Sequence, residues 1–82
     1  MKRPDWRVES YRGLDVYALI SRSGKGYGYE VRVGQEGCDP ADAGEVEILS
    51  SDGQVFVTSH AAEVAAFGAG YAYVDRVVGP VT

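Results

Sequence analysis

The last third of the chain predicts one amphipathic helix, and no other segment has its periodicity. About twenty residues after Ser59 contain no proline before Pro80, and bulky apolar side chains recur there at steps of three and four: Val64, Phe67, Tyr71, Val74 and Val78. Thr58 or Ser59 can cap its N-terminus, and Gly79-Pro80 can end it. We therefore expect a single helix over residues 59–78 to cover whatever the rest of the chain forms.

Two glycines inside this helix, Gly68 and Gly70, each cost about 1 kcal/mol relative to alanine. This cost is easier to understand if the helix backbone lies close against other structure at that turn. The two glycines therefore predict a close approach between the helix and the layer beneath it.

The residues before the helix alternate as strands do. From residue 14 to 21 the apolar Leu14, Val16, Ala18 and Ile20 share one face, and from residue 27 the side chains of Tyr27, Tyr29, Val31 and Val33 do the same. The glycine-rich turn at residues 21–26 joins these runs into a first hairpin.

Three further segments complete the predicted fold. Residues 6–11 open as a short edge strand that ends near Gly13, and residues 35–44 form an acidic surface loop. Asp52-Gly53, between Glu45–Leu49 and Gln54–Thr58, predicts a second hairpin. The fold class is therefore α+β, a single domain over residues 1–82, with antiparallel hairpins of about five strands, in one sheet or two small sheets, and one C-terminal helix packed on the sheet.

Composition limits the compartment and the class of protein. The chain has 82 residues, of which 45% are apolar and 24% charged, as in an ordinary globular domain. Cys38 is the only cysteine, so no internal disulfide forms, and this fits a reducing compartment. Residues 1–6 are followed by no apolar run of the kind that marks a signal peptide, and no stretch is long and apolar enough to span a membrane. We expect a cytoplasmic protein.

The charge is divided unevenly along the chain. Residues 1–35 carry seven of the eight basic side chains against four acids, a net charge of +3, whereas residues 36–82 carry one base against eight acids, a net charge of −7. In a compact domain the two halves can neutralise each other, or they can leave faces of opposite sign that pair between molecules. The sequence leaves both alternatives open.

Chemistry-bearing residues form no recognisable catalytic, cofactor or metal motif. His60 has no partner at ligand or catalytic spacing, and Asp39 next to Cys38 raises the pKa of the thiol rather than activating it. The acids between Glu36 and Glu47 lack calcium-loop spacing, and Gly24-Lys25-Gly26 precedes a strand instead of a helix. We predict no enzyme, no cofactor and no metal site.

Two surface hypotheses remain. A helix on one sheet face leaves Tyr17 and Leu19 on the other face, and we expect Leu49 and Phe56 to need cover there too, from a second layer or from another molecule. Aromatic residues beside cations on the first hairpin also suit single-stranded nucleic acid, although a sequence pI of about 4.7 makes nucleic acid an unlikely partner. The candidate interaction surface comprises Tyr17, Leu19, Tyr27, Tyr29, Arg22, Lys25 and Arg32.

The chain also resembles a loose class of small uncharacterised bacterial proteins, mostly proteobacterial and sometimes prophage-borne. Residues 11–13 match this class weakly. The main matching residues lie in the last third of the chain: Phe56, Thr58, Ala61, Ala65, Tyr71, Val74 and Asp75. It implies a β-then-α domain without catalytic residues. We therefore expect a small non-enzymatic protein–protein interaction or structural accessory protein that binds an unidentified protein or itself and contacts no membrane. The alternative is a weak module for single-stranded nucleic acid.

Overall fold

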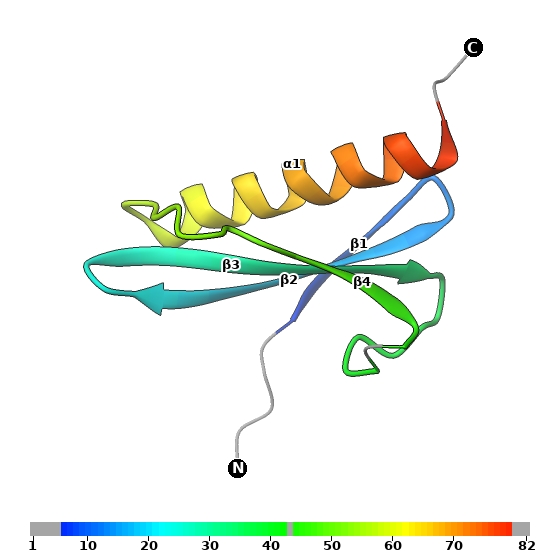
Figure 1. Ribbon diagram of the computed structural model, residues 1–82, viewed down its shortest axis with the longest axis horizontal. Coiled ribbons are helices and arrows are strands. Elements are labelled where there is room, and N and C mark those ends of the chain that lie inside the picture. The colour runs from blue at the N-terminus through cyan, green and yellow to red at the C-terminus, as the bar shows by residue number, and fades with distance from the viewer. Residues whose placement is uncertain (1–5, 43, 80–82) are drawn as a thin grey trace.

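The computed structural model describes residues 6–42 and 44–79. These residues form one four-stranded antiparallel sheet in the order β1-β2-β3-β4, and one helix lies along one side of it (Figure 1). The elements are β1 (Arg7–Tyr11), β2 (Leu14–Ser23), β3 (Gly26–Gln35), β4 (Val46–Ser50) and α1 (Ser59–Val78). The α+β class, the order of the elements and the position of the helix on the sheet are as the sequence predicted.

The first two connections are tight two-residue turns. Arg12 and Gly13 join β1 to β2 with φ values of 53° and 85°, and Gly24 (φ 60°) with Lys25 joins β2 to β3. Arg12 also reaches the far end of the chain, since its Nη1 donates to Asp75 Oδ1 and to the carbonyl oxygen of Gly79, both at 2.9 Å. The β1–β2 turn is therefore fastened to the C-terminus of α1, where a cation is electrostatically favoured.

The predicted second hairpin is wrong, although its turn forms. Asp52 and Gly53 adopt φ values of 52° and 86°, but the chain then rejoins β3, where Phe56 and Tyr27 exchange two backbone hydrogen bonds of 2.8 Å. Continued from Ser50, the register of β4 would place Gly53 opposite Tyr27. The turn is therefore a bulge of three extra residues in the segment that pairs along the outer side of β3. By rejoining β3, this segment pairs the backbone groups of Tyr27, which a separate hairpin would leave unpaired.

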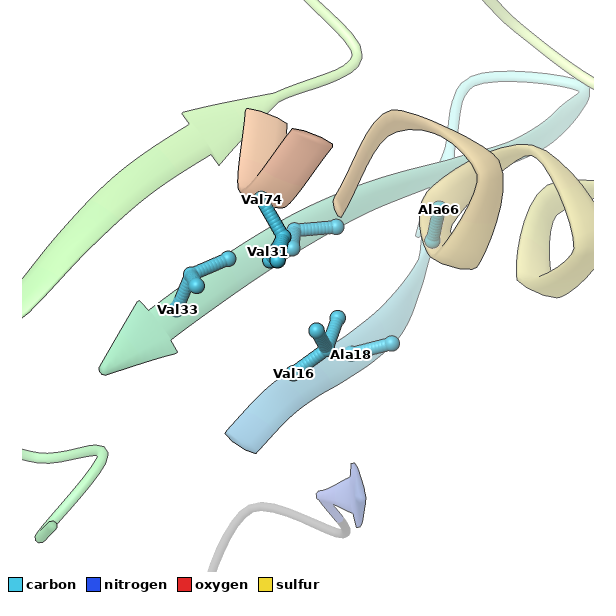
Figure 2. Close-up of a cluster of buried hydrophobic side chains, with 6 residues drawn as sticks. All are labelled: Val16, Ala18, Val31, Val33, Ala66 and Val74. Carbon is cyan, nitrogen blue, oxygen red and sulfur yellow. The ribbon is translucent and has the colours of Figure 1, made fainter. Parts of the chain in front are cut away.

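The core lies between α1 and alternate residues of β2 and β3. Figure 2 shows the buried cluster, in which the side chains of the two strands meet those of the helix: Val16, Ala18, Val31, Val33, Ala66 and Val74. A Cβ atom at Gly70 would overlap the side chain of Val16, so the helix backbone itself contacts the sheet. This confirms the predicted close approach at Gly70. The same prediction is wrong for Gly68, which is exposed and has no neighbour within 4 Å of the point where a Cβ atom would lie.

The helix buries a different line of residues from the one that its bulky side chains predict. Its buried residues are small ones at steps of four together with one valine: Ala62, Ala66, Gly70 and Val74. Of the predicted stripe only Val74 is fully buried, since Phe67 and Tyr71 are half-buried, whereas Val64 and Val78 are 59% and 47% exposed. Small residues allow the helix axis to lie near the sheet, and this closeness leaves the larger side chains on the flanks of the helix.

Ion pairs join the basic and acidic halves of the chain. Arg7 Nε lies 2.9 Å from Glu63 Oε1, and Arg12 Nη1 lies 2.9 Å from Asp75 Oδ1. Intramolecular neutralisation therefore accounts for part of the charge division. The N-terminus of α1 is capped as expected, since the Thr58 hydroxyl accepts from the amide of Ala61 at 3.0 Å. Within residues 6–42 and 44–79, no helix combines the length and the hydropathy that crossing a membrane requires.

Candidate interaction surface

The face of the sheet that points away from α1 carries exposed apolar side chains. The strand register places Val8, Leu19 and Ile48 on this open face, together with Tyr17 and Arg32. Val8 is 52% and Ile48 42% exposed, whereas Leu19 and Tyr17 are half-buried. The described strands all belong to one sheet, so in this part of the chain the sheet does not curl into the second layer that would cover the open face.

The acidic loop between β3 and β4 covers one end of the open face. Figure 1 shows this loop on the side of the sheet away from α1. Its backbone accepts hydrogen bonds from Tyr17 Oη (to Cys38 O, 3.1 Å) and from Arg32 Nη1 (to Pro40 O, 2.7 Å), and the Gly37 amide donates to Asp15 Oδ2 at 3.1 Å. The loop thus supplies internal cover near Tyr17 and Arg32, while Val8 and Ile48 stay about half exposed.

An aromatic and charged cluster occupies the middle of the open face. Trp6 packs edge-on against Tyr17, with ring centroids 6.4 Å apart, and the Arg32 guanidinium lies 5.3 Å from the Trp6 ring centroid. Arg32 Nε also donates to Glu30 Oε2 at 2.9 Å. Sequence reasoning did not assign Trp6 to this surface, although it stands two residues before Val8 and strand alternation puts both on the same face.

The structure divides the predicted set of seven surface residues between the two faces of the sheet. The register places Tyr27, Tyr29 and Arg22 on the side of α1, where Arg22 lies 5.3 Å from the Tyr27 ring centroid and Tyr29 packs against Phe56 at 6.0 Å. Exposed Lys25 stands in the turn between β2 and β3. Tyr17, Leu19 and Arg32 share the open face. The nucleic-acid hypothesis, which combined Tyr27, Tyr29 and Lys25 with Arg32, stays a prediction.

Leu49 and Phe56 do not lie where they were expected. Leu49 packs against the core on the side of α1, and Phe56 lies against Tyr29 on that side. The expectation that both need cover on the opposite face is therefore wrong, and Ile48 takes the open-face position on β4. The register explains both positions, since Leu49 pairs with Val31 and Phe56 with Tyr27, and both partners lie on the side of α1.

The two side chains that could act as a base or a nucleophile, His60 and Cys38, lie in different elements of the fold. His60 is exposed in the first turn of α1. Partial burial raises the pKa of the Cys38 thiol, and the carboxylates of Asp15 and Glu45 raise it further. In the loop, Asp42 Oδ1 accepts from the Gly44 amide at 2.9 Å, and Glu45 Oε2 accepts from the Asp39 amide at 3.1 Å. Among the residues that the structure describes, no group of three or more His, Cys, Asp or Glu side chains is placed to hold a metal ion.

No family model, curated protein or solved structure matches this chain. The open face is therefore interpreted from its own residues and contacts.

Proposed function

We propose that this protein is a small non-enzymatic interaction or structural accessory protein, and that its open face docks against the open face of a second copy. The observation that supports the proposal is the exposure of Val8 and Ile48 beside Leu19 on a sheet whose other face α1 already closes. An antiparallel sheet with one solvated face normally carries polar side chains there. Apolar side chains on such a face favour a protein partner.

The charges of the open face favour a second copy as that partner. Glu30 and Arg32 project from the same face of β3, one of the two central strands, and form an ion pair within the chain. A two-fold axis passing between them brings Arg32 of one copy close to Glu30 of the other, so that the face is complementary to itself. The apolar side chains on β1, β2 and β4 then surround these ion pairs.

The size of the open face sets the expected strength of the association. Four strands about 4.8 Å apart and up to ten residues long present a face of roughly 19 Å by 33 Å. A standard stable interface buries about 800 Å² on each partner. Because the acidic loop covers one end of the face, we expect a weak dimer that dissociates on dilution.

Two single charge variants test the pairing. Glu30→Arg gives a face with two cations, and Arg32→Glu gives one with two anions, so each variant alone should remain monomeric. Mixed in equal amounts they should form a heterodimer, because each face now complements the other. Sedimentation velocity from about 10 µM to about 1 mM measures all three samples and the wild type. Circular dichroism checks the folded state, because Arg32 also holds the loop at Pro40.

A matched pair of variants, each replacing an exposed apolar residue with glutamate, locates the interface. Ile48→Glu places a charge on the open face and should abolish dimerisation, whereas Val57→Glu alters a valine that is 89% exposed outside the strands and should leave it unchanged. A wild type that stays strictly monomeric at about 1 mM rejects the proposal. The cytoplasmic location and the bacterial, prophage-borne origin stay part of this proposal, and the origin rests on the resemblance alone.

A further inference from the structure

A second surface, on the other side of the sheet, forms a groove between α1 and β1. Its volume is about 500 Å³, and its lining comes from one side of the helix and from one strand residue: Glu63, Val64, Phe67, Gly68, Tyr71 and Glu9. The rings of Phe67 and Tyr71 lie 6.0 Å apart along it, and Tyr11 continues the row at 4.5 Å from Tyr71. The wall of the groove is thus apolar and aromatic, and its two carboxylates lie at positions 9 and 63.

The groove contains space that the fold does not use. Gly68 is exposed, and nothing lies within 4 Å of the position that its Cβ would take. Packing therefore gives no reason for a glycine at this helical position, in contrast to Gly70, where a Cβ would overlap Val16. Val64, one turn earlier on the same rim, is 59% exposed. A side chain from outside can therefore reach the helix backbone between Val64 and Tyr71.

The strand beside the groove is an edge of the sheet. In the described part of the chain, β1 pairs only with β2. Alternate residues of such an edge point their N–H and C=O groups outward, where they can pair with another extended segment. Four contacts hold β1 and its turn to the helix, so that the edge and the groove keep a fixed relation: Arg7–Glu63, Glu9–Tyr71, Tyr11–Asp75 and Arg12–Asp75.

We propose that this groove binds an extended basic segment of a partner protein, which adds a strand to β1 and places one apolar side chain over Gly68. Side chains of an added strand alternate between the two faces of the sheet, so residues at i−2, i and i+2 all face the helix side. An apolar residue at i fills the space beside Phe67 and Tyr71. Lysine or arginine at i−2 and i+2 then reaches the carboxylate of Glu9, which accepts from the Tyr71 hydroxyl, and that of Glu63, whose ion-pair partner Arg7 has a side chain that is 60% exposed.

A short designed peptide tests the site directly. The probe is Ac-Thr-Lys-Thr-Leu-Thr-Lys-Thr-NH2, in which both lysines and the leucine share one strand face, and the control replaces both lysines with glutamate. Titration of the protein, followed by the backbone amide signals in NMR spectra, should shift the amides of β1 and of Gly68. The lysine peptide should bind at least about tenfold more tightly than the glutamate peptide, and added salt should reduce the difference.

Two helix variants that introduce the same leucine side chain separate groove filling from general damage. Gly68→Leu occupies the groove and should weaken binding about tenfold or more, whereas Ala72→Leu adds the same side chain at an exposed position outside the groove and should leave it within about twofold. Neither position is packed, so both variants should fold. Absence of shifts in β1, or equal binding by Gly68→Leu and wild type, overturns the proposal. So does a changed oligomeric state of Gly68→Leu without peptide, since that would assign the groove to a second copy.

Discussion

The two faces of the sheet are built from the same strands but differ in how far their side chains are buried. On the face covered by α1, Val16, Ala18 and Val31 have no exposed surface. On the open face, one residue along in the same strands, Tyr17 and Leu19 stay half-buried, and Arg32 is held by the acidic loop and by Trp6. The fully buried side chains of the covered face are small or β-branched, whereas the open face carries Tyr17, Leu19 and Arg32 at the neighbouring positions.

This difference separates two uses of apolar surface. The small residues of the covered face allow the backbone of α1 to lie near the sheet at Gly70, so this face contributes to the stability of the monomer. The larger side chains of the open face meet no second layer in the described residues. Removing a side chain from each face should therefore change two different quantities, the free energy of unfolding and the extent of association.

The two faces are compared directly by Val16→Ala and Leu19→Ala. Val16 is completely buried under α1, and its truncation should reduce the free energy of unfolding by about 2 kcal/mol. Leu19→Ala removes more atoms, but from a half-buried side chain, and should cost about 1 kcal/mol or less in dilute solution. Urea denaturation at low protein concentration measures both. An equal or larger loss for Leu19→Ala would show that the open face belongs to the core of the monomer.

Alanine substitutions at the two helix glycines should change the stability in opposite directions. Gly70→Ala forces a methyl group into Val16 and should destabilise the protein by about 1 to 3 kcal/mol, despite the better helix propensity of alanine. Gly68→Ala meets no neighbour and should stabilise it by about 0.5 to 1 kcal/mol. Thermal unfolding monitored by circular dichroism compares the two variants. If both shift the midpoint in the same direction, the contrast between the packed and the unpacked glycine is wrong.

Local patterns in the sequence predicted much of this fold, because each one depends on neighbouring residues. The alternation from Leu14 to Val33 identified the first hairpin, and Thr58 and Gly79 marked the ends of the helix. The rotation of the helix was mispredicted, because counting bulky residues favours Val64 and Val78 over Ala62 and Gly70. Which line faces the sheet depends on how closely the two can approach, and that is a property of the assembled layers.

The candidate surface was predictable only in part, for a related reason. Alternation placed Tyr17, Leu19 and Arg32 on the face opposite the helix, as the register shows. The predicted surface also included Tyr27 and Tyr29, which are close to Arg32 in sequence. They lie on the other face of the sheet, because alternate residues of a strand point to opposite faces. The contacts of Arg32 with Trp6 and Pro40 join distant segments, and no local pattern in the chain specifies them.

The smallest expected effect compares tyrosines of the two faces at alkaline pH. On the helix side, the hydrogen bond that Tyr11 donates to Asp75 raises the pKa of its phenol, and burial raises that of Tyr71, with the Glu9 hydrogen bond adding to it. On the open face, burial beneath the loop is the main cause of the raised pKa of Tyr17. The unfolded chain therefore loses these protons first, at the ordinary tyrosine pKa of about 10.

Stability from these groups is complete below about pH 10 and is lost as the pH rises through the higher folded-state values, because in that interval the folded state binds more protons than the unfolded state. The urea midpoint of wild type should therefore fall between about pH 9 and about pH 11, and Tyr71→Phe and Tyr17→Phe should each reduce the fall. All are compared in a Cys38→Ser background, since the raised thiol pKa acts in the same direction.

Dilute protein isolates the monomer. At high concentration only Tyr17→Phe should alter the pH dependence of dimerisation, because Tyr71 lies beside the groove on the opposite side of the sheet. An equal change in Tyr71→Phe would show that association involves the helix side.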